Sequence, residues 1–404
     1  MSDERAERPI RRRVFYIPGF DPYPPRRYRE LYRKQGAEQA RISGYRLALR
    51  ARIGAPLYSW DVAARMDDRR IQSRYEVLVW HDLVKTAMDT SIAGTYLQLL
   101  RTAWLYVTSR ALWRLSLLRK GPVIAALYPI FALLGQLLAA FLAGYLVTRV
   151  ISGLTWPGVG LIAGLPLFVF LMQWFRRQDH RWFAYYLMHD YAFTASRKGA
   201  NPPLLETRME EFRTRIRAAL ASDVHEVLVV GHSSGAQLAV SILADLDRAG
   251  DIPEGSPALG LLTLGQVLPM VSFLPKAMRL RRDLQDLSLS RSIFWLDVSA
   301  PGDGCSFALC DPVAVSGVAP KAQRWPLVIS AAFSQTLSPA KWNSLKRQYF
   351  RLHFQYLCAF DRPGDYDYFR ITAGPLTLAE RFAGRAPSKS RIDVPASPHV
   401  SLGR

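Results

Sequence analysis

A serine flanked by two glycines lies where a short apolar segment meets a helical pattern. Residues 227–235 read VLVVGHSSG, and AQLAVSILADL follows directly. Gly231 and Gly235 stand two residues before and two residues after Ser233. A serine hydroxyl is a weak nucleophile, so it must be presented to a general base, and a sharp strand-to-helix turn with little room for side chains does this. The spacing therefore predicts nucleophilic attack on a carbonyl by Ser233.

This segment resembles the nucleophile elbow of the α/β-hydrolase superfamily. The valine-rich run is typical of a buried parallel strand, and Ala236, Leu238 and Ile242 recur at helical spacing after the turn. The alternative is a glycine-rich turn in another kind of α/β protein. The resemblance implies three further parts, which are an oxyanion-binding turn after an early strand, an acid after a late strand, and a histidine near the C-terminal end.

The early strand is predicted at residues 14–17, VFYI, which lead into Pro18-Gly19-Phe20. Members of the superfamily commonly carry His-Gly here, and this sequence departs from that pattern with Pro18. Because backbone N–H groups bind the oxyanion, the departure leaves the donors in place. The resemblance implies that the N–H groups of Phe20 and Ser234 form the oxyanion hole. A buried strand with an ordinary Pro-Gly turn is the alternative.

Two aspartates compete for the role of the acid. Residues 292–298, SIFWLDV, are predicted to form a strand that contains Asp297, and Asp303 lies in the loop beyond it. A carboxylate in the loop can turn back toward the histidine, whereas the direction of Asp297 depends on the pleat of the strand. Asp303 is therefore preferred, although Pro-Gly-Asp-Gly is also an ordinary turn composition.

Of the seven histidines, only His353 and His399 follow both acid candidates. Residues 347–352, RQYFRL, are predicted to form the last strand and to place His353 at its end. His399 lies in a tail rich in proline, serine and arginine, which we expect to be disordered. His353 is the preferred base, and an aromatic-flanked histidine at the edge of a core is the alternative.

The remaining pattern alternates strands with helices. Strands are predicted at residues 75–80 and 259–264, and helices at 204–220 and 273–287. Such alternation is typical of an α/β fold. The expected fold is an α/β-hydrolase-like, mostly parallel sheet flanked by helices, with one inserted apolar segment.

The inserted segment contains two uncharged stretches that only Arg149 separates. Residues 122–147 and 158–175 are each long enough to span a bilayer, and together they predict a transmembrane helical hairpin with its turn at 148–157. Arg149 and Trp156 would lie at the interface. Basic residues flank both outer ends of the hairpin, namely Arg114, Arg119, Lys120, Arg176, Arg177 and Arg181. The positive-inside rule therefore places both termini and the catalytic domain in the cytoplasm.

The expected organisation is a single α/β domain that the hairpin divides. Its parts are an N-terminal part of the domain (1–81), an amphipathic membrane-proximal helix (82–120), the hairpin (121–176), a C-terminal part with the elbow (177–385) and a disordered tail (386–404). The helix at 82–120 could lie on the bilayer surface or pack on the sheet, and the sequence favours neither. The first thirteen residues contain no apolar segment typical of a signal peptide.

The chain is strongly basic, with 53 Lys and Arg residues against 33 Asp and Glu residues and a net charge of +20. Nucleic acid is the usual partner of such a chain. Here the excess flanks the apolar stretches and both termini, which favours anionic lipid on the cytoplasmic face, and no nucleic-acid motif is present. Cys305 and Cys310 lie beside Asp303 and Asp311, but no nearby histidine or second cysteine pair completes a metal site. We expect no metal and no cofactor.

Together these patterns predict a membrane-anchored serine hydrolase. Ser233 would attack a carboxylic ester or thioester to form an acyl-enzyme, His353 would move the proton, and Asp303 would orient the imidazole. Its location alone suggests a lipid-like ester. Two alternatives stay open: an acyltransferase with the same triad, and a non-catalytic hydrolase-fold scaffold at a membrane.

Overall fold

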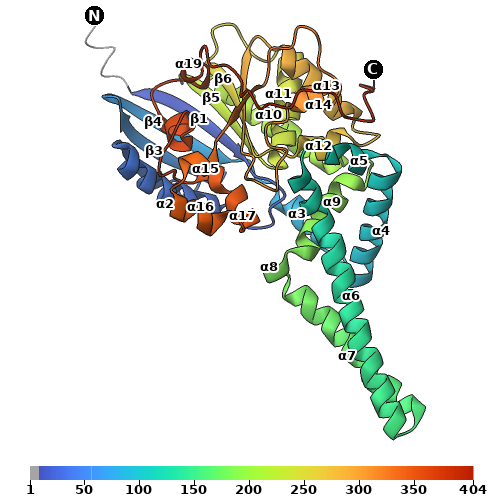
Figure 1. The fold of residues 1–404 in the computed structure, drawn as a ribbon. Helices are drawn as coiled ribbons and strands as arrows, with labels where there is room; N and C mark the ends of the chain where they lie inside the picture. The colour runs from blue at the N-terminus through green and yellow to red at the C-terminus, as the bar shows by residue number, and fades with distance from the viewer. Residues whose placement is uncertain (1–8, 56, 404) are drawn as a thin grey trace, which may run out of the picture.

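The computed structural model describes residues 9–55 and 57–403, which are built around one eight-stranded sheet (Figure 1). The strand order is β2-β3-β4-β1-β5-β6-β7-β8. Only β3 runs antiparallel to its neighbours, and every other pair is parallel. The strands are β1 (Ile10–Ile17), β2 (Arg46–Ala51), β3 (Ser59–Met66), β4 (Arg69–Val77), β5 (Glu226–His232), β6 (Ala258–Leu264), β7 (Ile293–Ser299) and β8 (Leu327–Ser330). The predicted α/β fold with a mostly parallel sheet is confirmed.

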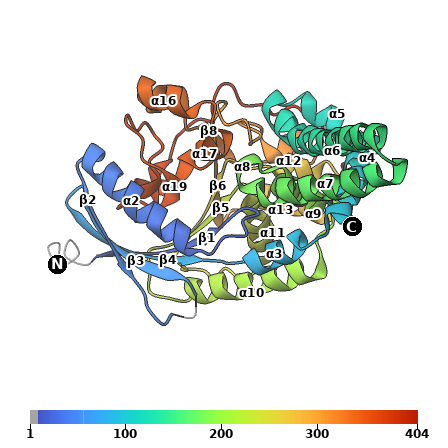
Figure 2. The same ribbon diagram turned by 90° about the horizontal axis from the view of Figure 1, so that it is seen from below.

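Helices cover both faces of the sheet, as the apolar strands of a parallel sheet require (Figure 2). Helix α2 (Arg26–Ser43) lies on one face, over an aromatic cluster that includes Trp60. The other face carries α10 (Pro203–Leu220), α11 (Gly235–Arg248) and α13 (Met278–Leu289), whose apolar side chains form a second cluster with the sheet. The predicted helix at 204–220 is confirmed, whereas the one predicted at 273–287 begins five residues later.

The strand order reverses at β1, which has β4 on one side and β5 on the other. From β1 the chain first builds β2, β3 and β4 on one side, and then crosses to build β5 to β8 on the other. Ile17 pairs with Gly231, so the ends of β1 and β5 lie side by side. In open α/β sheets a crevice forms at the carboxyl ends of the strands where the order reverses. The turns after β1 and β5 both leave the sheet there.

Helices α6 (Lys120–Leu154) and α7 (Pro157–Arg177) pack along each other and project from the domain (Figure 1). The turn between them is shorter than predicted, and Arg149 lies within α6. A Cβ built on Gly164 would lie 2.4 Å from the carbonyl oxygen of Gly144, so small residues permit this close packing.

Both helices are long and apolar enough to cross a membrane. In the most apolar stretch of each helix, only 22% of α6 and 17% of α7 is buried. The core helix of a soluble domain would bury most of this surface, whereas most of it is exposed on α6 and α7.

Residues 82–118 form three helices instead of the single amphipathic helix that we predicted. They are α3 (His81–Met88), α4 (Ile92–Thr108) and α5 (Ala111–Ser116). Ser91 caps α4 by accepting a hydrogen bond from the N–H of Gly94, and Arg110 adopts a left-handed φ of 62° between α4 and α5. These two breaks explain why one continuous helix does not form.

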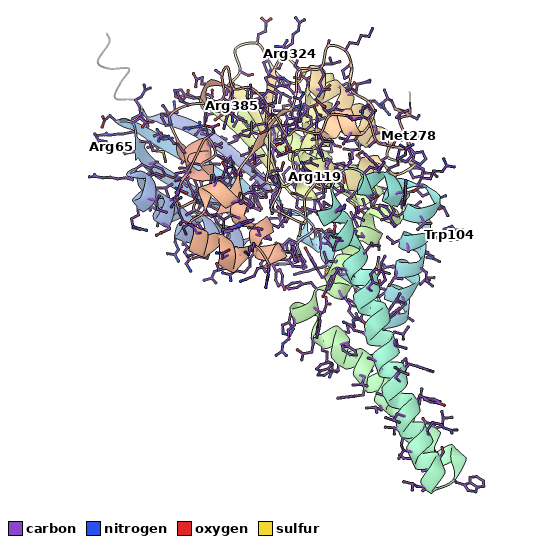
Figure 3. The ribbon with its side chains drawn as sticks, viewed as in Figure 1. Arg65, Trp104, Arg119, Met278, Arg324 and Arg385 are labelled. Carbon is purple, nitrogen blue, oxygen red and sulfur yellow. The ribbon has the colours of Figure 1, made fainter. Side chains whose placement is uncertain are left out.

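Helix α4 packs against α9 (Ala184–Ala195) and not on the sheet. Leu99 is buried in this contact, whereas Trp104 on the outer side of α4 is 73% exposed (Figure 3). One face of α4 therefore packs against α9, and another face is apolar and exposed. The two expected arrangements were a helix on the bilayer surface and a helix packed on the sheet, and neither includes the contact with α9.

The strand predicted at residues 347–352 is wrong. These residues lead into and form most of the short helix α17 (Tyr349–His353), and the sheet ends with β8. The run RQYFRL has aromatic residues at positions that suit one helical turn equally well, and this turn buries Leu352 and His353. His353 thus lies at the end of a helix.

The remaining helical elements are short. They are α8 (Asp179–Trp182), α12 (Leu268–Ser272), α14 (Pro312–Val315), α15 (Phe333–Thr336), α16 (Pro339–Leu345), the 3₁₀ turn η1 (Gln355–Leu357), α18 (Tyr368–Ala373) and α19 (Leu378–Arg381). Residues 1–8 of the expected N-terminal part lie outside the described residues.

The tail from residue 386 to 403 is packed on the domain, contrary to the predicted disorder. The N–H of Ser388 donates to the carbonyl of Val328, and Ile392 pairs with Cys310 in an isolated bridge. The carbonyl of Ser401 accepts a hydrogen bond from the buried guanidinium of Arg281 at 2.7 Å. The proline-rich composition predicted disorder. The tail is ordered without helices or strands of its own because its backbone forms hydrogen bonds with the domain.

Candidate functional site

Ser233 occupies the sharp turn between β5 and α11. Its φ is 56°, a left-handed conformation that is costly for a residue with a side chain and persists where the surroundings hold it in place. A Cβ on Gly235 would lie 2.2 Å from the carbonyl oxygen of Ile17, and a Cβ on Gly231 would lie 2.7 Å from the Cα of Ala236. Gly235 therefore lets the turn pack against the end of β1, and Gly231 lets α11 pack closely on β5.

The turn after β1 lies directly beside Ser233. A Cβ on Gly19 would lie 3.0 Å from the Cβ of Ser233. The carbonyl of Pro18 accepts a hydrogen bond of 2.9 Å from the indole of Trp80, which fixes this turn. Within the described part of the chain, the N–H groups of Phe20 and Ser234 have no hydrogen-bond acceptor. Two backbone donors therefore remain for a ligand on either side of Ser233.

Asp303 and His353 form a buried pair. His353 Nδ1 and Asp303 Oδ2 are 2.8 Å apart, and the hydroxyl of Tyr356 donates to the same oxygen at 3.0 Å. The other carboxylate oxygen accepts the N–H of Cys305 at 3.0 Å. Burial alone would raise the pKa of Asp303, but the neighbouring imidazole and these hydrogen bonds hold it below its usual range. The carboxylate is ionised and can orient the ring.

The second ring nitrogen of His353, Nε2, is available to accept a proton from a neighbouring group. Nε2 is buried and has no hydrogen-bond partner among the described residues, so Ser233 and His353 are not joined by a hydrogen bond in this structure. Both residues nevertheless line the same cavity. Hydrogen bonds between catalytic groups are often long until substrate binds.

The two rival residues lie elsewhere. Asp297 is buried within β7, where it accepts a hydrogen bond of 2.6 Å from the hydroxyl of Thr263. Burial raises the pKa of Asp297 to about 7. The carbonyl of His399 accepts a hydrogen bond from Ser397 in the C-terminal tail. Neither Asp297 nor His399 is among the described residues that line the cavity.

Two residues that no spacing pattern marks hold the pair in place. His232 donates from Nε2 to the carbonyl of His353 at 3.0 Å, and burial lowers the pKa of His232 to about 3, so its ring stays neutral. A Cβ on Gly265 would lie 3.1 Å from Cε1 of His353 and 2.6 Å from the ring of Tyr356. The ring of His353 therefore rests against a glycine with a left-handed φ of 51°.

Helix α9 adds a carboxyl group that the sequence interpretation missed. Asp190 lines the cavity near the hydroxyl of Ser234 and the ring of His353. Burial raises the pKa of Asp190 to about 7, although His353 and Ser234 oppose the shift. The available signal was that Asp190 is the only acid in the apolar run 182–196.

Replacing Asp190 by asparagine should change how the stability of the protein depends on pH. The pKa of this carboxyl is about 7 in the folded chain and about 3.9 in an unfolded one. Its contribution to stability is therefore complete below about pH 4 and is lost as the pH rises to 7 and beyond. Unfolding midpoints measured in detergent from about pH 5 to about pH 8 should rise for Asp190→Asn relative to the native protein. A constant difference between the two would contradict this placement.

The cavity next to Ser233 has a volume of about 620 Å³. Its lining comes from the turns after β1 and β5, from α17, from α8 and α9, and from the first turns of α6. Most of these side chains are apolar, and the volume lies in the range of sites for small organic ligands. The hydroxyl of Ser233, the imidazole of His353, the carboxyl group of Asp190 and two free backbone donors thus meet at one apolar cavity.

One trio in this site could also be considered for metal binding. Ligand atoms of Asp303, Cys305 and His353 lie within 4.8 Å of one another. A thiol binds a metal as the thiolate, and burial raises the pKa of Cys305 well above its usual value. Asp303 already binds His353 and Tyr356. The donor set suits an oriented imidazole better than a metal ion.

The chain matches no family model, and no significant match is found among curated proteins or solved structures. The chemistry of the site therefore has to be judged from its own geometry.

Proposed function

We propose that the protein is a serine hydrolase of the α/β-hydrolase type that cleaves a carboxylic ester or thioester. One observation carries this proposal. Ser233 stands in a left-handed strand-to-helix turn and shares a cavity with an imidazole whose Nδ1 is held by a buried carboxylate. A nucleophile, a base and a group that orients the base are the three parts that acyl transfer to serine requires.

In this mechanism the Oγ of Ser233 bonds to the carbonyl carbon while Nε2 of His353 takes the hydroxyl proton. Collapse of the tetrahedral intermediate breaks the bond to the leaving alcohol or thiol, which receives that proton from His353. Water, deprotonated by the same nitrogen, then attacks the acyl-enzyme, and the bond to Oγ breaks as His353 returns that proton to Ser233, which releases the acid. Asp303 keeps its hydrogen bond to Nδ1 throughout and stabilises the imidazolium.

The N–H groups of Phe20 and Ser234 would bind the oxyanion. Both residues line the cavity, and Gly19 lets the turn after β1 approach Ser233 closely. Donors that are fixed before the reaction stabilise the developing charge without reorganising, and each is typically worth about 10²- to 10³-fold in rate.

A membrane anchor formed by α6 and α7 completes the proposal. Both ends of the helix pair meet the domain, so the chain before α6 and the chain after α7 lie on the same side (Figure 1). Arg119 at the start of α6 donates to the carbonyl of Ala308 at 2.8 Å, at the junction of the pair with the domain (Figure 3). Basic residues at both outer ends favour the cytoplasmic side, where anionic lipid is the expected contact.

Labelling with a fluorophosphonate tests this function directly. The native protein in detergent should form a covalent adduct, because this reagent mimics the acyl transition state and phosphonylates activated serines. Ser233→Ala should abolish the adduct, since it removes the attacking oxygen. Mass spectrometry of the labelled peptide should place the adduct on Ser233.

Ser344→Ala is the matched control, because Ser344 is an exposed serine on α16 that lies outside the cavity lining. It should label like the native protein. An adduct that persists in Ser233→Ala would exclude Ser233 as the nucleophile. Absence of any adduct on the native protein would favour the non-catalytic scaffold.

A further inference from the structure

The first turns of α6 form part of the wall of the cavity that contains Ser233. Ile124 and Ala125 of α6 line it together with Tyr186 and Leu187 of α9. Gly121 lies against the loop of the acid, since a Cβ built on it would be 3.0 Å from the Cα of Gly304. The apolar end of the cavity is therefore built from the same helix that continues into the projecting pair.

We call the part of the cavity that residues of α6 and α8 line its mouth, and this part lies at the level where that pair leaves the domain. The hydroxyl of Tyr128 donates to the carbonyl of Trp182 at 2.6 Å, and both residues line the cavity. This bond places Tyr128 of α6 level with α8, just after the end of α7. Helix α7 has 21 residues and is about 31 Å long, close to the roughly 30 Å of a bilayer core. With α7 spanning the bilayer as proposed above, the mouth falls at the membrane–water interface, where Tyr and Trp side chains are favoured.

Three arginines surround the same mouth. Arg181 belongs to α8, Arg347 lies just before α17, and Arg351 belongs to α17. The rings of Phe183 and Phe350 pack with centroids 4.6 Å apart, which brings α8 and α17 together. Within the described residues none of the three arginines forms an ion pair, and Arg351 donates to the amide oxygen of Gln348.

Several arginines elsewhere in the domain are paired with carboxylates. Arg248 contacts three carboxylates and Arg279 contacts three. The guanidiniums at the mouth are therefore free to bind an anion from outside the chain. Planar guanidinium groups suit phosphate oxygens, which they can bind in a bidentate manner.

We infer that the substrate is an acyl lipid with an anionic phosphate headgroup, which enters from the plane of the membrane between α6 and α8. This inference rests on the proposed function and names its substrate class. The acyl chain lies along Ile124 and Ala125, the ester reaches Ser233, and the phosphate binds Arg347 and Arg351. A membrane source is favoured over a soluble acyl thioester because the mouth lies where the apolar surface of the helix pair begins.

Two variants test the two ends of this substrate. Ala125→Trp fills the chain end of the cavity, and Leu138→Trp is its control at an exposed position of α6. Arg347→Gln/Arg351→Gln removes two of the three arginines at the mouth, the two that are proposed to bind the phosphate. Its control is Arg65→Gln/Arg324→Gln, which loses the same charge on parts of the domain remote from the helix pair (Figure 3).

Hydrolysis is measured on vesicles of phosphatidylglycerol or phosphatidylcholine and on the soluble ester p-nitrophenyl butyrate. We expect Ala125→Trp to lower the rate on both lipids at least about 10-fold and the butyrate rate much less, because a short acyl chain fills less of the cavity. The double arginine variant should lower kcat/KM for phosphatidylglycerol at least about 10-fold and that for phosphatidylcholine much less. Both control variants should match the native protein.

Fluorophosphonate labelling of each variant separates the two levels of the proposal. Normal labelling without the expected lipid selectivity would overturn the inference and leave the proposed function standing. Faster hydrolysis of palmitoyl-coenzyme A than of either vesicle lipid would also overturn it, because it would identify a soluble anionic thioester as the substrate. Absence of labelling in the native protein would overturn both.

Discussion

Asp303→Asn is expected to lower kcat for ester hydrolysis by about 10⁴-fold. Asparagine keeps the shape of the side chain but loses the charge that stabilises the imidazolium, and its amide can donate to Nδ1 and force the wrong tautomer of His353. The KM should change little, because Asp303 lies behind the ring and does not line the cavity. Initial rates on a soluble ester measure the effect.

Asp297→Asn is the matched control for this experiment, since it is the other aspartate at this end of β7. Asp297 binds Thr263, and its raised pKa of about 7 already keeps much of it protonated at neutral pH. An amide is therefore a close mimic, and the variant should retain kcat within a few-fold. Equal losses in the two variants would refute the assignment of Asp303 as the residue that orients His353.

Gly235→Ala should prevent the chain from folding to the native state. The added Cβ would lie 2.2 Å from the carbonyl oxygen of Ile17 and 2.5 Å from that of Pro18. Both contacts are with backbone at the end of β1 and in the turn after it, which pairing with neighbouring strands holds in place, and we expect a loss of more than about 4 kcal/mol. The yield of monodisperse protein after extraction in detergent, and the unfolding midpoint of what remains, measure the loss.

Gly135→Ala provides the comparison for this variant. A Cβ on Gly135 meets no atom within 4 Å, and the residue lies inside helix α6. Its stability should stay within about 1 kcal/mol of the native protein. A Gly235→Ala protein as stable as Gly135→Ala would mean that the turns after β1 and β5 do not pack as the structure describes.

The strand-to-helix turn at Ser233 could be predicted because its determinants are local. A run of β-branched residues, two glycines at fixed spacing and a helical repeat specify it within twenty residues. The contact between Asp303 and His353 spans 50 residues, and only the chain order implied by the family resemblance suggested it. No local pattern in the sequence identifies β4 and β5 as the strands that pair with β1.

Elements that depend on tertiary packing were the ones missed. Residues 347–352 suit a strand or a helical turn equally, and the choice is made by burial of Leu352 and His353 against the sheet. Asp190 joins the cavity only because α9 returns to the domain after α7. The tail is held by backbone hydrogen bonds to β8, to α14 and to the chain just before α14, which composition does not encode.

The central position of β1 has a consequence for how the chain matures during synthesis. Strand β1 is made first, but its partner β5 follows roughly 200 residues later, which takes on the order of 10–40 s at ribosomal rates. Until then one side of β1 is an unpaired edge, the kind of surface on which chains aggregate. Arg11, Arg12 and Arg13 charge that edge, and Arg12 becomes buried against Glu226 once β5 arrives. The ion pair between Arg12 and Glu226 thus joins the first strand of the chain to the strand that leads into Ser233.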